Sequence, residues 1–67
     1  MKNNIRFIRK EMKISQEELA HKCDVTRQTV NAIENNKYDP TLALAFKLSI
    51  SLNTKVDNLF IFGGEEE

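Results

Sequence analysis

The sequence predicts an all-α domain of five short helices, and three observations lead to this fold class. Apolar residues recur at helical spacing along most of the chain. Ser or Thr stands directly before four of these segments, in the position from which it would cap a helix. The chain has 67 residues with one Pro and two Gly, which is enough for one small core and little more.

The first helix is predicted from about Asn4 to Met12. At about 100° per residue, Ile5, Ile8 and Met12 fall on one apolar stripe. Arg9 lies inside the same stripe. Because an unpaired charge in a protein interior is costly, Arg9 requires a partner on the core side of this helix.

A second helix is predicted to begin after Ser15. The letters "SQEE" form a capping box, in which the Ser15 hydroxyl accepts a backbone N–H and Glu18 reaches back. The turn that follows is "CDV", where Asp24 is expected in the left-handed conformation that Asp tolerates better than most residues. Val25 is then expected as a buried plug. The inward face of this helix consists of Leu19, Ala20 and Cys23.

The third helix is predicted from its Thr26 cap to about Asn35, and its two faces differ in chemistry. One arc is expected to face the body of the domain. The opposite arc carries amide and guanidinium groups without a carboxylate, and the small Ala32 would allow close approach to a groove floor. Arg pairs with the guanine edge and Asn or Gln with the adenine edge, whereas a merely solvated helix face usually mixes Glu and Lys. The body-facing residues are Thr29, Val30 and Ile33, and the outward ones are Arg27, Gln28, Asn31 and Asn35.

The stretch "TLALAFKLSISLN" alternates apolar and polar residues as a strand would, yet its features favour a helix. It is longer than a typical strand, rich in Leu and Ala, and preceded by Pro40 and a Thr41 cap. Its apolar arc is wide, which predicts a central core helix buried on more than one side. The residues expected to face water are Ala43, Lys47 and Ser51.

The end of the chain leaves two alternatives open. Thr54 is expected to cap a short fifth helix that reaches Phe60. Phe60, Ile61 and Phe62 then follow one another where little core remains to receive them. They are expected either to pack back, as a short C-terminal β-strand, or to meet a second copy of the chain.

Charge and composition narrow the classes of function. Net charge is zero, but three of the ten acidic residues are Glu65, Glu66 and Glu67, and through Tyr38 eight basic residues oppose five acidic ones. A mildly basic body is compatible with a nucleic-acid partner. We expect a domain at residues 1–62 and a flexible acidic tail at 63–67. One cysteine indicates a reduced, cytoplasmic setting, and no run approaches the roughly 18 apolar residues of a membrane span.

From Ile5 to Phe60 the chain resembles the Cro/C1-type helix-turn-helix regulators, also called the XRE family. The resemblance rests on "IRK" with Arg9, "ISQEELA", "VTRQTVNAIENNKYDP", the apolar "TLALAFKLSISLN" and "KVDNLF". It is strongest to the stand-alone mini-regulators, such as the cytolysin-operon repressor, which bind DNA as dimers and carry short C-terminal strands. The resemblance implies a five-helix Cro/C1 repressor-like DNA-binding domain with its helix-turn-helix at about residues 16–35. The turn often holds Gly in this family, where this chain has Asp24.

The resemblance also implies roles for individual residues. Arg9 would pair with Glu34, which gives the charge on the core face its partner. Asp39 lies in a loop near DNA, either as a turn residue or as an acceptor for cytosine N4. Dimer contacts are expected from "FIF" and from the outward side of the central helix. Gln16 would bond a DNA phosphate with its side chain and with the N-terminus of the second helix. The implied base contacts are Arg27, Gln28 and Asn31, and the further phosphate contacts are Thr26, Asn36, Lys37 and Tyr38. Our candidates for the dimer contact are Phe60, Ile61 and Phe62.

The function implied is a sequence-specific regulator of transcription, expected to be a repressor. It would bind a palindromic operator in double-stranded DNA as a homodimer, with the third helix in the major groove. An antitoxin-type autoregulator is one alternative, although the six residues after Ile61 are short for a toxin-binding extension. A protein-interaction module that has lost DNA binding is another. We expect no enzyme activity, cofactor, metal or small-molecule ligand, because His21 lacks partners at ligand spacing and no nucleophile–base pair is evident.

Overall fold

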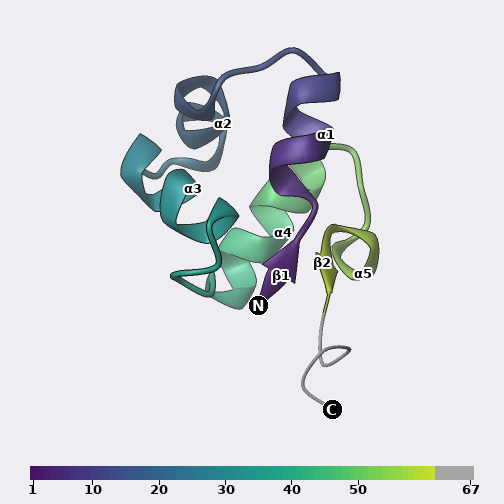
Figure 1. The fold of residues 1–67 in the computed structure, drawn as a ribbon. Helices are drawn as coiled ribbons and strands as arrows, with labels where there is room; N and C mark the ends of the chain where they lie inside the picture. The colour runs from purple at the N-terminus through teal and green to yellow at the C-terminus, as the bar shows by residue number, and fades with distance from the viewer. Residues whose placement is uncertain (62–67) are drawn as a thin grey trace.

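The computed structural model describes residues 1–61, which form five helices and a two-stranded sheet (Figure 1). The predicted five-helix fold class is confirmed, with a small sheet added. Phe62 and the predicted tail at 63–67 lie outside the described residues. In chain order the elements are β1 (Lys2–Asn3), α1 (Ile5–Glu11), α2 (Gln16–Cys23), α3 (Arg27–Glu34), α4 (Leu42–Ser51), α5 (Val56–Leu59) and β2 (Phe60–Ile61).

All five helices contribute to one hydrophobic core. α4 passes behind α1 and α3 in Figure 1 and packs against both α2 and α5. Burying one large aliphatic side chain contributes about 1.5–3 kcal/mol, so these few residues supply most of the stabilisation available to so small a domain. The largest side chains that are fully buried are Ile5, Leu19, Val30, Ile33, Leu48, Leu52 and Leu59.

The predicted start and end of α2 are confirmed. The Ser15 hydroxyl accepts the Glu18 backbone N–H at 3.0 Å, and the Glu18 carboxylate accepts the Ser15 N–H at 2.8 Å. Asp24 has φ of 64°, the left-handed conformation predicted for it, and the Val25 N–H donates to the Ala20 carbonyl at 3.0 Å. Val25 is partly buried against the core. The turn therefore sends the chain directly into α3.

Thr26 and Thr41 cap α3 and α4 as predicted, but the prediction for Thr54 is wrong. The Thr54 hydroxyl donates to the Leu52 carbonyl at 2.9 Å, and its backbone N–H donates to Ser49 at 3.0 Å. Asn53, which lies between Leu52 and Thr54, has φ of 51°, in the left-handed region. Thr54 is therefore used to close the C-terminus of α4, and α5 begins later, after Lys55, without a side-chain cap.

Two predicted buried faces are partly exposed. Met12 follows the end of α1 and is 42% exposed, so it does not extend the stripe begun by Ile5. α4 is central to the core but is not buried on more than one side of the protomer, because its neighbours cover one face. The buried residues of that face are Leu44, Ala45 and Leu48, whereas Leu42, Phe46 and Ile50 are 70%, 51% and 77% exposed.

The C-terminal segment packs back as a strand, the first of the two alternatives. β1 and β2 are antiparallel, with Lys2 opposite Ile61 and Asn3 opposite Phe60. Phe60 begins this strand rather than continuing α5, and it is buried in the core. The Asn4 N–H donates to the Leu59 carbonyl at 2.9 Å, so both ends of the described chain are joined.

Candidate nucleic-acid interface

α2, the three-residue turn 24–26 and α3 form a rigid pair of helices at one side of the domain (Figure 1). The inner face of α3 places Val30 and Ile33, each 1% exposed, in the core shared with Leu19 and Ala20 of α2. Burial of one face fixes the rotation of α3 about its axis. Its other face is consequently held outward on a rigid support.

The outward face of α3 brings together the residues predicted to contact bases. Arg27, Gln28, Asn31 and Asn35 are all exposed, whereas Ala32 is partly buried. The single carboxylate of this helix, Glu34, is on the buried side and paired with arginine. The exposed face thus carries one positive charge and three amides, with no negative group to repel phosphates.

The residues predicted to contact phosphates lie at helix ends around α3. Thr26 is exposed at the N-terminus, while Asn36, Lys37 and Tyr38 are exposed just past the C-terminus. Asn36 has φ of 62°, and the Lys37 N–H donates to the Ala32 carbonyl at 2.9 Å, so the chain reverses tightly there. The Asp39 carboxylate accepts from the N-terminal ammonium group at 3.1 Å, which favours the turn interpretation of that residue.

Arg9 and Glu34 form the ion pair that the resemblance implied. Arg9 Nε donates to Glu34 Oε2 at 2.7 Å and Arg9 Nη2 to Oε1 at 3.3 Å, a two-point contact between buried groups. Arg9 Nη1 also donates to the Ile14 carbonyl at 3.0 Å. One guanidinium therefore ties α1 to the end of α3 and to the segment leading into α2.

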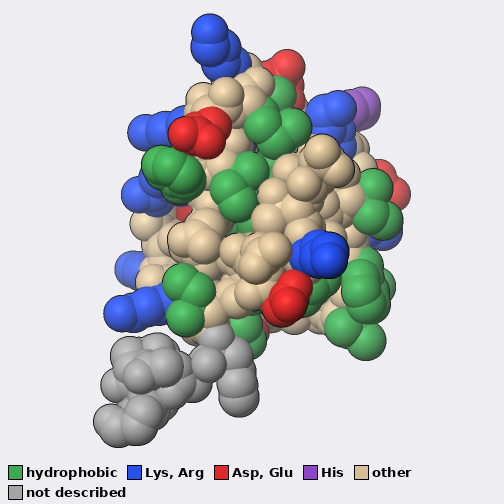
Figure 2. All heavy atoms as spheres, turned by 90° about the vertical axis from the view of Figure 1, so that its right-hand side faces the viewer, with side chains coloured by type: hydrophobic (Ala, Val, Ile, Leu, Met, Phe, Trp, Pro, Cys, Tyr) green, Lys and Arg blue, Asp and Glu red, His purple; other side chains and the backbone are tan. Residues whose placement is uncertain are grey.

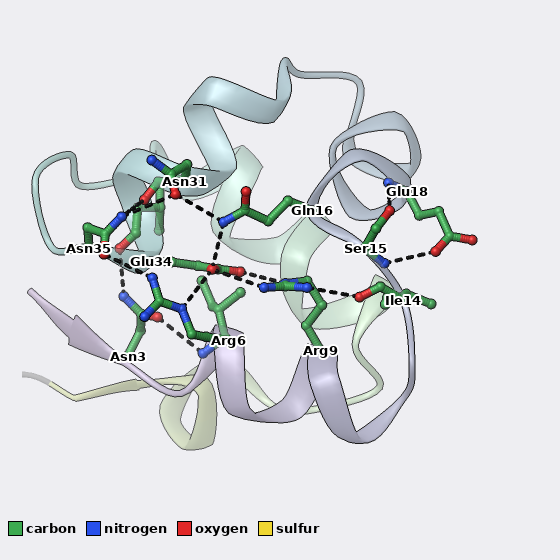
Figure 3. A network of polar contacts seen from close by, with 12 residues as sticks. Asn3, Arg6, Arg9, Ile14, Ser15, Gln16, Glu18, Asn31, Glu34 and Asn35 are labelled. Carbon is green, nitrogen blue, oxygen red and sulfur yellow. Dashed lines mark hydrogen bonds and ion pairs between the residues drawn. The ribbon is translucent and has the colours of Figure 1, made fainter.

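Two further donors converge on the same carboxylate (Figure 3). Arg6 Nε and Gln16 Nε2 donate to Glu34 Oε1 at 3.3 and 3.0 Å. Burial alone would raise the pKa of the Glu34 carboxyl, but the hydrogen bonds from Arg9 and then Gln16, with the Arg9 charge, outweigh it and hold the pKa below its ordinary value. Glu34 is therefore a charged anchor within the support of α3.

The network continues from Glu34 to the outward face of α3. Gln16 Nε2 also donates to Asn31 Oδ1 at 3.1 Å, so both N–H groups of the Gln16 amide are engaged. Asn35 Nδ2 donates to the backbone carbonyl of Asn31 at 2.9 Å and to its Oδ1 at 3.2 Å. Arg6 Nη2 donates to Asn35 Oδ1 at 2.9 Å. These hydrogen bonds of Arg6 and Asn35 were not predicted from the sequence, because no local sequence pattern indicates them.

The residues predicted for a dimer contact divide between core and surface. Phe60 is only 9% exposed and packs within the protomer, while Ile61 is 41% exposed. The outward side of α4, also predicted as a contact, carries an apolar stripe formed by Leu42, Phe46 and Ile50. An open groove of about 540 Å³ adjoins this stripe, and its lining consists of Met1, Pro40, Leu42, Ala45, Val56, Asp57 and Phe60.

Residues 1–61 contain no group of three or more His, Cys, Asp or Glu side chains placed to hold a metal ion. Cys23 is buried, with its sulfur 3.6 Å from the Ser51 hydroxyl. Among the same residues, no helix has the length and apolar character needed to cross a membrane.

Comparison with known proteins identifies relatives along nearly the whole chain. The family model described as helix-turn-helix matches residues 5–59. An HTH-type transcriptional regulator of Methanocaldococcus jannaschii is 44% identical over 98% of this chain and 100% of the relative, and Bacillus subtilis YgzD is 42% identical over 90% and 91%. The restriction-modification controller protein C.AhdI of Aeromonas hydrophila superposes with a TM-score of 0.79 at 28% identity, covering 85% of this chain and 86% of its own. The N-terminal DNA-binding domain of Bacillus subtilis SinR gives a TM-score of 0.77 at 31% identity, covering 96% and 91%.

Proposed function

The chain belongs to the helix-turn-helix family of DNA-binding transcriptional regulators of the Cro/C1 type, and we propose that it binds a palindromic operator as a homodimer and represses transcription. The observation that carries the proposal is the outward face of α3, where Arg27, Gln28 and Asn31 are exposed on a helix whose other face is fixed in the core. A helix of this size fits the major groove of B-DNA. Non-enzymatic regulation follows from the family.

Within this proposal, α3 enters the major groove and its first residues reach the bases. Arg27 offers a guanidinium fork that matches the two acceptors of guanine, and Gln28 beside it offers one donor and one acceptor. Lys37 and Tyr38 flank the other end of α3 and would contact phosphates together with Asn36. These contacts set the register, whereas the base contacts supply the sequence preference.

Gln16 would contact a phosphate through the backbone of α2. Its side-chain amide already donates to Glu34 and Asn31, which leaves no side-chain N–H for DNA in this arrangement. The Ser15 cap accepts the N–H of Glu18, and the earlier amide groups of the helix remain available. A helix N-terminus with free N–H groups favours an anion such as a DNA phosphate.

We propose the stripe formed by Leu42, Phe46 and Ile50 as the dimer contact, joined by Ile61. Leu42, Phe46 and Ile50 lie one helical turn apart on α4 and remain 51–77% exposed in one protomer. Figure 2 shows hydrophobic side chains gathered at the lower right of one face, with Lys and Arg along its left edge. Contiguous exposed apolar surface is typical of protein interfaces. Two protomers bound to one DNA duplex would also make twice as many phosphate contacts as one. Phe60 would support this surface from within the core.

The dimer proposal is tested by sedimentation equilibrium of Phe46→Asp. Placing a carboxylate in the middle of the apolar stripe should shift the mass to that of a monomer, while circular dichroism stays helical. Phe7→Asp is the matched control, because Phe7 is 65% exposed on α1, outside the stripe. A wild type that remains monomeric at high concentration, or a Phe46→Asp protein that remains dimeric, would contradict the proposed contact.

The base-contact proposal is tested by measuring DNA affinity of Arg27→Ala. Loss of a two-point contact to guanine should cost about 1–3 kcal/mol and relax preference at one base pair of each half-site. Lys47→Ala is the control, since Lys47 is an exposed cation on α4 rather than on α3. If both variants lose affinity equally for every sequence, Arg27 contributes charge alone and the assignment fails.

Kinship to the stand-alone mini-regulators such as the cytolysin-operon repressor belongs to the same proposal. Its support is the short β2 strand at the C-terminal side of α5. We also propose a cytoplasmic location, where a regulator of transcription meets DNA. Repression would follow from blocking polymerase at the operator. A reporter gene placed behind that operator tests whether the protein represses or activates transcription.

A further inference from the structure

We propose that Asn31 reads guanine rather than adenine, because the fold turns its amide oxygen inward and offers only its NH₂ group to the groove. This inference rests on the proposed function, namely that α3 reads base edges. It concerns the orientation of the Asn31 side-chain amide, that is, whether its oxygen or its nitrogen faces the groove. Hydrogen bonds on two sides of Asn31 determine this orientation.

The first side is anchored by a carboxylate. Ionised Glu34 can only accept hydrogen bonds, so the Gln16 atom 3.0 Å from its Oε1 is the amide nitrogen. The second N–H of that nitrogen points to the Asn31 side chain at 3.1 Å. A donor there requires an acceptor opposite it, which places the Asn31 oxygen, and not its nitrogen, toward Gln16.

The second side is anchored by a guanidinium. Arg6 can only donate, so the Asn35 atom 2.9 Å from its Nη2 is the amide oxygen. Asn35 Nδ2 consequently faces α3, where it donates to the Asn31 carbonyl at 2.9 Å and to Asn31 Oδ1 at 3.2 Å. Two chains of hydrogen bonds, one from Glu34 through Gln16 and one from Arg6 through Asn35, therefore end on the same side-chain oxygen and occupy both of its lone pairs.

The amide nitrogen of Asn31 is what remains for DNA. Figure 3 shows this nitrogen on the side away from Gln16, and within residues 1–61 no acceptor is paired with it. Asn31 itself is exposed on the outward face of α3. The side chain thus presents two donors and no free acceptor.

Only one base edge suits two donors well. Guanine presents two acceptors in the major groove, N7 and O6, whereas adenine presents one acceptor and one donor. The usual two-point contact of Asn to adenine needs the side-chain oxygen, which Gln16 and Asn35 already occupy here. Cytosine offers a donor, and thymine a single acceptor, so guanine is the best match of the four.

The test uses an operator obtained by selection with the full-length protein. The base pair that depends on Asn31 is the one whose preference disappears in Asn31→Ala. Affinity is then measured with each of the four bases and with 7-deazaguanine at that position. Wild type should prefer guanine over adenine by about tenfold and lose much of this preference with 7-deazaguanine, while Asn31→Ala responds to neither change.

The second arm of the test removes the hydrogen bonds that hold the side-chain oxygen of Asn31. In the double variant Gln16→Ala with Asn35→Ala, the oxygen of Asn31 is freed, and adenine should gain on guanine at that position. Gln28→Ala is the control, because it should alter preference at a different base pair. Folding of each variant is checked by circular dichroism.

The possible failures are distinguishable. Adenine preferred at the Asn31-dependent base pair, with no effect of 7-deazaguanine, would overturn the proposed polarity. An Asn31→Ala protein that reads every base pair like wild type, while Arg27→Ala does not, would overturn the role of Asn31 and leave the proposed function standing. If no duplex is enriched by wild type, the proposed function itself fails, and this inference with it.

Discussion

Replacing Arg9 with Ala should strand the Glu34 carboxylate inside the domain. The Glu34 side chain is 0% exposed, and Arg9 contacts both of its oxygens, at 2.7 and 3.3 Å. Removing one partner of a buried pair costs about 3–5 kcal/mol. Arg6 and Gln16 still donate to Glu34, which places the expected loss at about 3 kcal/mol. A domain of this length has a total stability of roughly 3–10 kcal/mol, so the variant should lose between about a third and all of it.

Urea unfolding followed by circular dichroism, at one fixed protomer concentration, measures this loss. Arg6→Ala is the matched control, because Arg6 makes a 3.3 Å contact with the same carboxylate but its side chain is 49% exposed. Such a pair contributes under about 1 kcal/mol. The double variant Arg9→Met with Glu34→Leu removes both buried charges and should lose less than Arg9→Ala alone.

Similar losses for Arg9→Ala and Arg6→Ala, each under about 1 kcal/mol, would refute this reasoning. They would mean that Glu34 reaches water when Arg9 is absent. A double variant less stable than the single one would likewise show that the pair itself, not the stranded charge, dominates the free energy.

Three further outcomes follow from the Glu34 network, the Asp24 turn and the ends of α4. The pKa of Glu34 is lowered mainly by Arg9 against the opposing effect of burial, so its stabilisation is complete above the ordinary carboxyl value of about 4.3 and is lost as pH falls through the lowered folded value. Urea midpoints measured against pH should fall at acid pH in the wild type, and this fall should be smaller in Glu34→Gln. If the midpoints of the two proteins depend on pH in the same way, Glu34 is not the group responsible. Asp24→Gly should raise the free energy of unfolding by about 0.5–1 kcal/mol, since Asp24 is exposed at φ of 64°, and a lower melting temperature would disprove it. Thr41→Ala should cost about 1 kcal/mol because it removes the cap of α4, and Thr54→Ala should cost less because Thr54 caps no helix N-terminus. Equal urea midpoints for the two variants would contradict this difference.

Features set by neighbouring residues were predictable from the sequence. The capping box of Ser15 and Glu18, the left-handed Asp24 and the Thr41 cap each depend on a few consecutive residues. The apolar side of α3 follows from helical spacing, which also separates Arg27, Gln28 and Asn31 from the core. These local rules suffice to expose the candidate reading face.

Features set by distant parts of the chain were not predictable in the same way. β1 exists because Asn3 and Lys2 meet β2 more than fifty residues later, and "MKNN" carries no strand signal of its own. Thr54 has the residue type of a cap, but the left-handed Asn53 assigns it to the end of α4. The wide apolar arc of α4 could not reveal which side the protomer leaves exposed, since that depends on where α2 and α5 pack.

The link from Gln16 to Asn31 shows the same limit within the candidate site. Sequence spacing places both residues at a helix-turn-helix surface, yet the polarity of the Asn31 amide depends on Arg6 and Glu34, from α1 and the end of α3. Hydrogen bonds between elements fix it, and these exist only once the helices have packed.

Selection of binding sites from random duplex DNA by the wild-type protein tests the central claim most directly. If α3 reads the major groove and the protein acts as a homodimer, the enriched sequences should contain two inverted half-sites with centres about 34 Å apart, one helical turn. Selection with Arg27→Ala should lose preference at one base pair in each half-site. Enrichment of no sequence, or of the same sequences by both proteins, would contradict the assignment of α3 as the reading helix.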